Sequence, residues 1–209
     1  MHNTQSSSVI AKLISILLLV GALTACGEEP HSESIISDAD VVGMTLEDVV
    51  TALETGALSS AALVESYLAR IESVDRRGPT LNAVIAINPD AMARAAESDA
   101  RRAAGNAKSR LDGVPVLLKD NIESLDPMAT TAGSTALIDN VTGRDSPLVA
   151  SLRSSGAIVL GKTNLSQWAN YRSTKSVSGW SSVGGLVKNP HVLDRQACGS
   201  SSGSASATA

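Results

Sequence analysis

Residues 113–122 read GVPVLLKDNI and place one lysine, Lys119, at the end of an otherwise apolar run. The run is short and is bounded by Gly113 and by Asp120 and Asn121, so it predicts a buried β-strand rather than a helix. Burial disfavours a charged lysine, which then either finds a carboxylate partner or acquires a pKa low enough for a base near neutral pH. The alternative, which this stretch leaves open, is a strand that ends in a solvated pair of Lys119 and Asp120.

Helical and extended patterns alternate on both sides of this strand. Before it, the pattern predicts two helices, a strand and an alanine-rich helix, at residues 45–56, 59–78, 81–87 and 90–104. After it we expect a loop, and then a helix, a buried strand and a short helical piece, at residues 146–155, 157–160 and 165–170. This alternation indicates the α/β fold class, with a mixed or largely parallel central sheet flanked by helices.

A run of glycine and serine, CGSSSGS, occupies residues 198–204. By composition alone it could be a flexible linker. Residues 199–203 also fit the G-x-S-x-G pattern of a nucleophile elbow, but an elbow needs a strand immediately before it, and residues 194–196 are polar. No Lys-Ser/Thr pair follows the glycines, so a phosphate-binding loop is excluded as well.

Taken together, four motifs resemble the amidase signature family, whose members hydrolyse amide bonds with a Ser-cisSer-Lys triad. They are GVPVLLKDNI at 113–122, TTAGS at 130–134, GAIVLGKTNLSQWAN at 156–170 and CGSSSGSASA at 198–207. The resemblance runs from about Thr45 to Ala209, and its wording is most similar to that of bacterial peptide amidases. It implies the amidase-signature fold, incomplete at the C-terminus.

The resemblance also implies roles for individual residues. Lys119 falls on the neutral catalytic base, Ser200 on the bridging serine that follows a cis peptide bond after Gly199, and Ser201 on a serine that supports the hydrogen bonds around the lysine. The family's nucleophilic serine lies well beyond the bridging serine, and no residue before Ala209 matches it. We therefore expect the nucleophile to be missing, and residues 1–209 to be a fragment that is inactive by itself.

The activity that the resemblance implies is hydrolysis of a linear amide through an acyl-enzyme, with a small-molecule or peptide amide as substrate. The chain departs from the family pattern at Gln167, where many relatives carry glutamate, and at Ser202, where many carry glycine. A non-catalytic envelope lipoprotein, or pseudo-enzyme remnant, that binds a ligand or partner is the alternative. A component of a tRNA-dependent amidotransferase would share the motifs, but an apparent export signal argues against that cytoplasmic role.

Charge and histidine spacing exclude two other classes of function. The chain has 17 basic and 21 acidic residues and contains no basic run, so nucleic acid is not an expected partner. His2, His31 and His191 lie far apart and form no metal-binding motif. We expect no metal and no cofactor.

Residues 1–25 predict a targeting segment. Lys12 precedes the apolar run at 13–23, which has the length of a signal-peptide core and is too short to span a bilayer. The segment ends in LTAC at 23–26, which resembles the bacterial lipoprotein box. We therefore predict lipidation of Cys26 and a lipid-anchored protein of the bacterial cell envelope that faces the periplasm or the exterior. The alternative is a plain signal peptide with an incidental cysteine.

The remaining sequence divides into a tether and one folded part. Residues 26–44 are polar and acidic, as in a tether, and leave 45–209 as the N-terminal part of an amidase domain. If Cys26 carries lipid, Cys198 has no partner for an intramolecular disulfide, and we predict that it is a small buried hydrophobe.

Three aromatic residues, Trp168, Tyr171 and Trp180, lie close together in a chain that has no phenylalanine. They either line a pocket or fill core gaps between the many alanines. The core interpretation is favoured because aromatic side chains dominate core burial, so we leave them out of the predicted site.

Overall fold

The computed structural model describes residues 41–209. The predicted signal peptide at 1–25, the lipidation site Cys26 and most of the tether lie outside the described residues. None of the helices in residues 41–209 combines the length and the apolar character needed to cross a bilayer.

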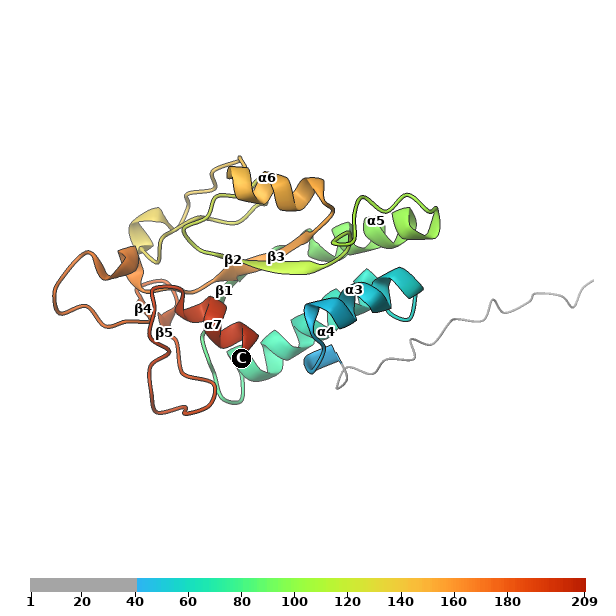
Figure 1. Cartoon of the computed structure of the whole chain (residues 1–209). Helices are drawn as coiled ribbons and strands as arrows, with labels where there is room; N and C mark the ends of the chain where they lie inside the picture. Colours follow the sequence, from blue (N-terminus) through green and yellow to red (C-terminus); the bar gives the residue numbers. More distant parts are fainter. Residues whose placement is uncertain (1–40) are drawn as a thin grey trace, which may run out of the picture. The chain divides into compact units, whose positions relative to one another are not determined.

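A three-stranded sheet forms the centre of the described chain (Figure 1). Its order is β1 (Val84–Ile87), β3 (Ile158–Thr163), β2 (Pro115–Lys119), so β3 is the middle strand. Strands β1 and β3 are antiparallel, whereas β2 and β3 are parallel. The sheet is therefore mixed, and the α/β class predicted from the alternation is confirmed. A small antiparallel pair, β4 (Trp180–Ser181) and β5 (Gly185–Leu186), lies in the later loops.

Within residues 41–209, five α-helices surround the sheet, and the sequence predicted four of them. Their bounds are α3 (Leu46–Thr55), α4 (Ser60–Arg70), α5 (Ala91–Ala103), α6 (Pro147–Ser154) and α7 (Ser202–Thr208). Helix α4 continues as a π-helical segment, Ile71–Arg76, and two 3₁₀ turns cover Thr135–Leu137 and Gln167–Asn170.

Local capping explains where the first helices begin and end. Thr45 and Asp48 form a reciprocal capping box at the start of α3, and Gly56 ends that helix in the left-handed conformation. The hydroxyl groups of Ser59 and Ser146 accept main-chain hydrogen bonds at the starts of α4 and α6. These starts are those that the sequence predicted.

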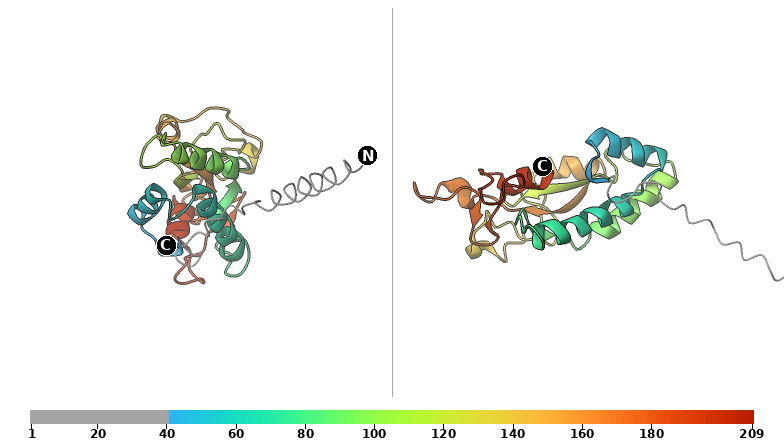
Figure 2. Two further views of the ribbon diagram at one scale, coloured as in Figure 1. Left: turned by 90° about the vertical axis from the view of Figure 1, so that its right-hand side faces the viewer. Right: turned by 90° about the horizontal axis from the view of Figure 1, so that it is seen from below.

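Apolar side chains cover both faces of the sheet. On one face, Val64 of α4 and Ala95 of α5 pack against Ile158 and Leu160 of β3. On the other, Val149 of α6 packs against neighbouring buried side chains of β2 and β3. Figure 1 accordingly shows α4 and α6 on opposite sides of the sheet, and the right-hand view of Figure 2 shows α7 beside it. The core thus fixes the strand whose end carries Lys119.

Three predicted elements differ from the structure in extent. The strand expected at 157–160 continues to Thr163, and the strand expected from Leu81 begins at Val84. The helical piece expected at 165–170 is a 3₁₀ turn in which Trp168 and Ala169 adopt left-handed backbone angles. The side-chain amide of Asn164, which precedes this turn, donates to the carbonyl groups of Asn82 and Gly185.

Candidate active site

The structure brings Lys119 and Ser200 together, although 81 positions separate them in the chain. Lys119 ends strand β2, as predicted, and its Nζ lies 2.7 Å from Ser200 Oγ, to which it donates a hydrogen bond. The peptide bond between Gly199 and Ser200 is cis, as predicted. Both side chains are partly buried, so the contact is shielded but remains open on one side.

Lys119 has no carboxylate partner among residues 41–209. Burial lowers the pKa of its amino group, and no acid in this part of the chain counteracts the effect. Asp120, the next residue, is 1% exposed and accepts hydrogen bonds from the main-chain N–H groups of Thr131 and Gly133. The solvated Lys119–Asp120 pair that the sequence left open is therefore wrong.

The residues that follow β3 hold Ser200 in place. The N–H of Ser166 donates to the carbonyl oxygen of Ser200 at 3.0 Å. The N–H of Gly203 donates to the carbonyl oxygen of Asn164, also at 3.0 Å. Strands β2 and β3 are adjacent and parallel, so their C-terminal ends lie side by side. The residues that follow β3 therefore hold Ser200 close to Lys119, which ends β2.

Two glycines, Gly199 and Gly203, allow the Gly-Ser run to approach the segment that follows β3 closely. A Cβ on Gly203 would overlap the carbonyl oxygen of Ala83 and lie 2.6 Å from that of Asn164. A Cβ on Gly199 would overlap Ser166 Oγ and lie 2.7 Å from Ser202 Oγ. The Gly-Ser run is therefore a packed junction, and the flexible-linker interpretation of its composition is wrong.

Two neighbours of Ser200 are not where the sequence analysis placed them. The side chain of Ser201 is exposed, and within the described residues its hydroxyl forms no hydrogen bond to Lys119. Ser202 is instead the buried serine, and its hydroxyl donates to the carbonyl oxygen of Cys198. Cys198 was predicted to be buried but is exposed, and its backbone is in the left-handed conformation, with φ 56°.

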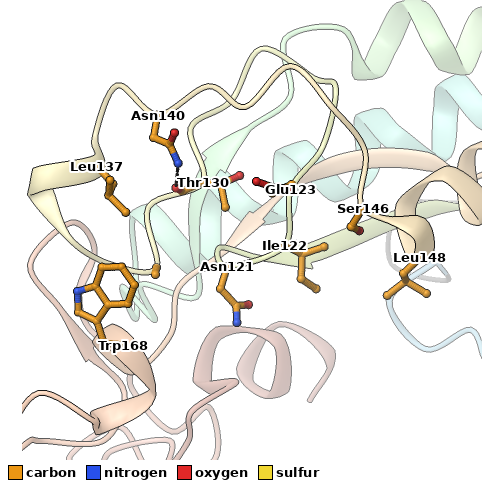
Figure 3. A pocket seen from close by; sticks show the side chains of 10 residues that line it. Asn121, Ile122, Glu123, Thr130, Leu137, Asn140, Ser146, Leu148 and Trp168 are labelled. Atoms are coloured by element: carbon orange, nitrogen blue, oxygen red, sulfur yellow. Dashed lines mark hydrogen bonds between the residues drawn. The ribbon is translucent and has the colours of Figure 1, made fainter.

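A cavity of about 500 Å³ begins two residues after Lys119 (Figure 3). Its walls are mainly the loop after β2, the 3₁₀ turn before Asn140, the start of α6 and Trp168; the lining residues are Asn121, Ile122, Glu123, Thr130, Ala132, Leu137, Asn140, Ser146, Leu148 and Trp168. A volume of this order is typical of small-molecule sites. Neither Lys119 nor Ser200 lines this cavity, which adjoins the turn that follows Lys119.

The aromatic residues do not fill the core. Trp168 is 46% exposed and lines the cavity, and Tyr171 is 94% exposed. Trp180 is half-buried, with the guanidinium of Arg172 over its ring. The favoured core interpretation is therefore wrong for Trp168 and Tyr171, which lie in and directly after a segment, 168–170, with left-handed backbone angles.

The sequence analysis missed Lys162, which is fully buried in β3. Its ammonium donates to the carbonyl oxygen of Ile122 and, at 2.9 Å, to Thr130 Oγ1. The sequence contained a signal for this burial. Lys162 follows the apolar run at 157–160 and precedes Leu165, and Lys119 likewise follows an apolar run.

No cluster of three or more metal-ligating side chains occurs in residues 41–209. The chemistry that the geometry of Lys119 and Ser200 offers is a proton relay. An amine with a lowered pKa contacts a serine hydroxyl, which can pass on a proton from a further hydroxyl group.

Replacing Gly203 by alanine tests how this junction positions Ser200. The new methyl group meets main-chain atoms on two sides, so α7 has to move away from β3 and carry Ser200 with it. We expect a loss of about 1–3 kcal/mol in the free energy of unfolding and a crystal structure in which the 2.7 Å contact is broken.

Gly43→Ala is the matched control, because no atom lies within 4 Å of its Cβ position. An intact Lys119–Ser200 contact in Gly203→Ala would contradict the proposed role of this junction.

Comparisons with known proteins agree with this geometry. The family model described as Amidase matches residues 62–209. The chain is 43% identical over 192 residues to a probable amidase of Arabidopsis thaliana, covering 91% of this chain and 37% of that protein. It is 40% identical over 156 residues to a glutamyl-tRNA(Gln) amidotransferase component of Symbiobacterium thermophilum, covering 74% of this chain and 30% of that protein.

Among solved structures, the native peptide amidase of Stenotrophomonas maltophilia matches with a TM-score of 0.77 and 50% identity. The match covers 79% of this chain and 34% of the peptide amidase, so the chain spans about a third of the length of these relatives. The motifs that contain Lys119 and Ser200 meet in one site, and the family model matches most of the chain. The chain therefore belongs to the amidase family.

Proposed function

We propose that this chain is part of an amide-bond hydrolase in which Lys119 is the general base and Ser200 is the bridging serine. The observation that carries the proposal is the 2.7 Å contact between Lys119 Nζ and Ser200 Oγ. The lowered pKa of Lys119 supports it, because a base must be largely neutral at the working pH.

The proposed reaction moves one proton along a short chain of groups. Ser200 passes its hydroxyl proton to neutral Lys119 and takes the proton of a nucleophilic serine, whose oxygen attacks the amide carbonyl carbon. The tetrahedral intermediate then breaks its C–N bond, and the leaving amine receives the proton from the relay. Water attacks the resulting ester by the same route and releases the acid.

The nucleophile in this proposal is a serine outside residues 1–209. Its support is the resemblance to the amidase signature motifs, in which the nucleophilic serine follows the bridging serine, together with the match to only about a third of each relative's length. Residues 1–209 alone are accordingly proposed to be inactive. Activity has to be tested in the longer polypeptide that supplies the serine.

The proposed substrate is a linear amide, either a small molecule or a peptide amide. Its support is the 50% identity to a protein that is named a peptide amidase. The amidotransferase relative brings no nucleic-acid partner into the proposal, because this chain is acidic overall, with a formal charge of −4.

The proposed location is the bacterial cell envelope, with a lipid on Cys26 holding the protein at a membrane. Its support is the apolar run at 13–23 followed by LTAC, and the polar stretch that separates Cys26 from α3.

Lys119→Ala and Ser200→Ala test the proton relay. In the longer polypeptide each substitution should lower kcat by about 10²- to 10⁴-fold, because each removes general-base catalysis. The double variant should be barely slower than either single one, since both groups serve the same relay. Steady-state kinetics with a peptide amide measures all three, and circular dichroism checks the fold.

Lys108→Met is the control for loss of a lysine, because Lys108 is exposed. Near-normal turnover in folded Lys119→Ala would remove the lysine from the mechanism. If the unsubstituted polypeptide hydrolyses no amide but still binds a ligand, the non-catalytic alternative would replace the proposal.

The pH profile tests the protonation state of Lys119. Only the neutral amine accepts a proton, so kcat/KM should rise with pH through the pKa of Lys119. Burial holds this pKa below the usual lysine value, so the rise should come at lower pH than for an exposed lysine. Lys108→Met should leave the profile unchanged, and a profile without this rise would argue against a lysine base.

Cys26→Ser tests the anchor. Without the thiol, no lipid can be attached, and the exported protein should move from the membrane fraction to the soluble fraction. Fractionation of cells that express the full gene measures this. An unchanged distribution would contradict lipidation and favour a plain signal peptide or another mode of attachment.

A further inference from the structure

Lys162 is a buried lysine that the proposed reaction does not use. Its exposure is 0%, and within residues 41–209 it forms no ion pair. Its two hydrogen-bond acceptors in this part of the chain are both neutral, the carbonyl oxygen of Ile122 and the hydroxyl of Thr130. An ammonium group in such a place costs free energy, and an apolar residue of similar volume is often neutral or stabilising there. Stability alone therefore does not explain the lysine.

Three carboxylates near Lys162 influence its pKa, but each of them has another binding partner. Burial lowers its pKa, and the carboxylates of Asp120, Asp126 and Glu123 act in the opposite direction. Asp120 binds main-chain N–H groups of the loop, Asp126 pairs with Arg153, and Glu123 pairs with Arg144. Lys162 is left to bind the loop itself.

Both acceptors of Lys162 lie in the loop that joins the proposed base to the cavity. Ile122 donates its N–H to the carbonyl oxygen of Lys119 at 2.9 Å, which closes the turn after the base. Thr130 exchanges hydrogen bonds with Asn140, since its carbonyl accepts from Asn140 Nδ2 at 2.9 Å and its N–H donates to the Asn140 carbonyl. The dashed line in Figure 3 marks the bond from Asn140 Nδ2 to the carbonyl oxygen of Thr130.

Ile122, Thr130 and Asn140 all line the cavity of about 500 Å³. One ammonium group thus connects the turn that follows Lys119 to two walls of the cavity. Among the described residues that line it, Glu123 alone is charged, and a bidentate ion pair with Arg144 neutralises it. The cavity therefore suits an uncharged group.

We propose that Lys162 is a positioning residue, whose buried ammonium holds the cavity in the shape that receives an uncharged part of the amide substrate beside Lys119. This inference rests on the proposed function, because it assigns the cavity to that substrate. Lys162 does not touch the reacting atoms. It acts through Ile122 and Thr130.

Lys162→Met in the longer polypeptide tests the proposal. Methionine keeps the apolar stem and loses the donors, so the loop should sample other shapes and bind substrate in only a fraction of them. We expect KM for a peptide amide to rise about tenfold or more, from the loss of hydrogen bonds to a charged group. At saturating substrate, kcat should fall less than about threefold.

Lys188→Met is a closely matched control. Lys188 also donates to one main-chain carbonyl and one threonine hydroxyl, those of Pro79 and Thr80, but these lie away from the cavity. Its KM should stay unchanged. Thr130→Val provides a second route to the same interaction if Lys162→Met does not fold, and it should raise KM in the same direction. The double variant should be little worse than Lys162→Met alone.

Hydrogen exchange gives a readout that needs no activity. Lys162→Met should accelerate exchange of the amides of Thr130 and Gly133 relative to the unsubstituted protein, while the amides of β3 remain protected. Unchanged KM in an active enzyme, or a lower melting temperature with KM and loop exchange unaltered, would overturn the proposal and leave Lys162 a purely structural residue.

Failure of the proposed function has a different signature. It appears as no amide hydrolysis by the unsubstituted polypeptide, or as normal turnover by Lys119→Ala. Failure of the Lys162 proposal appears instead in an enzyme that is active and that depends on Lys119.

Discussion

Strand β3 is hydrogen-bonded on both edges and buried along its whole length, and the position of each candidate functional group depends on it. Its pairing with β2 sets Lys119 opposite Thr163, and the residues immediately after it bind the main chain at Ser200 and at Gly203. Gly161 permits the pairing of β3 with its other neighbour, β1, since a Cβ there would overlap the carbonyl oxygen of Ala86. The central strand thus brings together a lysine and a serine that lie far apart in the sequence.

The two lysines at this sheet, Lys119 and Lys162, have different environments, and this difference accounts for the roles proposed for them. Lys119 is partly exposed, and its hydrogen-bond partner is a hydroxyl that can exchange a proton. Lys162 is sealed from solvent and donates to the carbonyl oxygen of Ile122 and to the hydroxyl of Thr130. Burial lowers the pKa of both lysines, but of these two only Lys119 is partly exposed and contacts the proposed bridging serine.

The sequence predicts most helices and strands because local signals determine them. The capping box at Thr45 and the apolar run before Lys119 are examples. The exposed positions of Cys198 and Trp168 could not be predicted in this way, since both residues adopt left-handed backbone angles that no local sequence pattern indicates. The burial of Lys162 was also missed, because its acceptors belong to a loop 32 to 40 residues earlier in the chain. For the site, motif resemblance paired Lys119 with Ser200, whereas composition and periodicity alone did not.

The alternation of side chains along a β-strand explains how a lysine can serve as a base directly before an aspartate. Successive residues of an extended chain point to opposite sides, so Lys119 faces Ser200 while Asp120 faces Thr131 and Gly133. An ion pair between the two would stabilise the ammonium and raise the pKa of Lys119, which would remove the neutral amine that a base requires. Instead, Asp120 holds the loop that carries the cavity wall, and its charge is directed to main-chain N–H groups. The strand geometry therefore separates the acid from the base, and the two neighbours can act on the same site without neutralising each other.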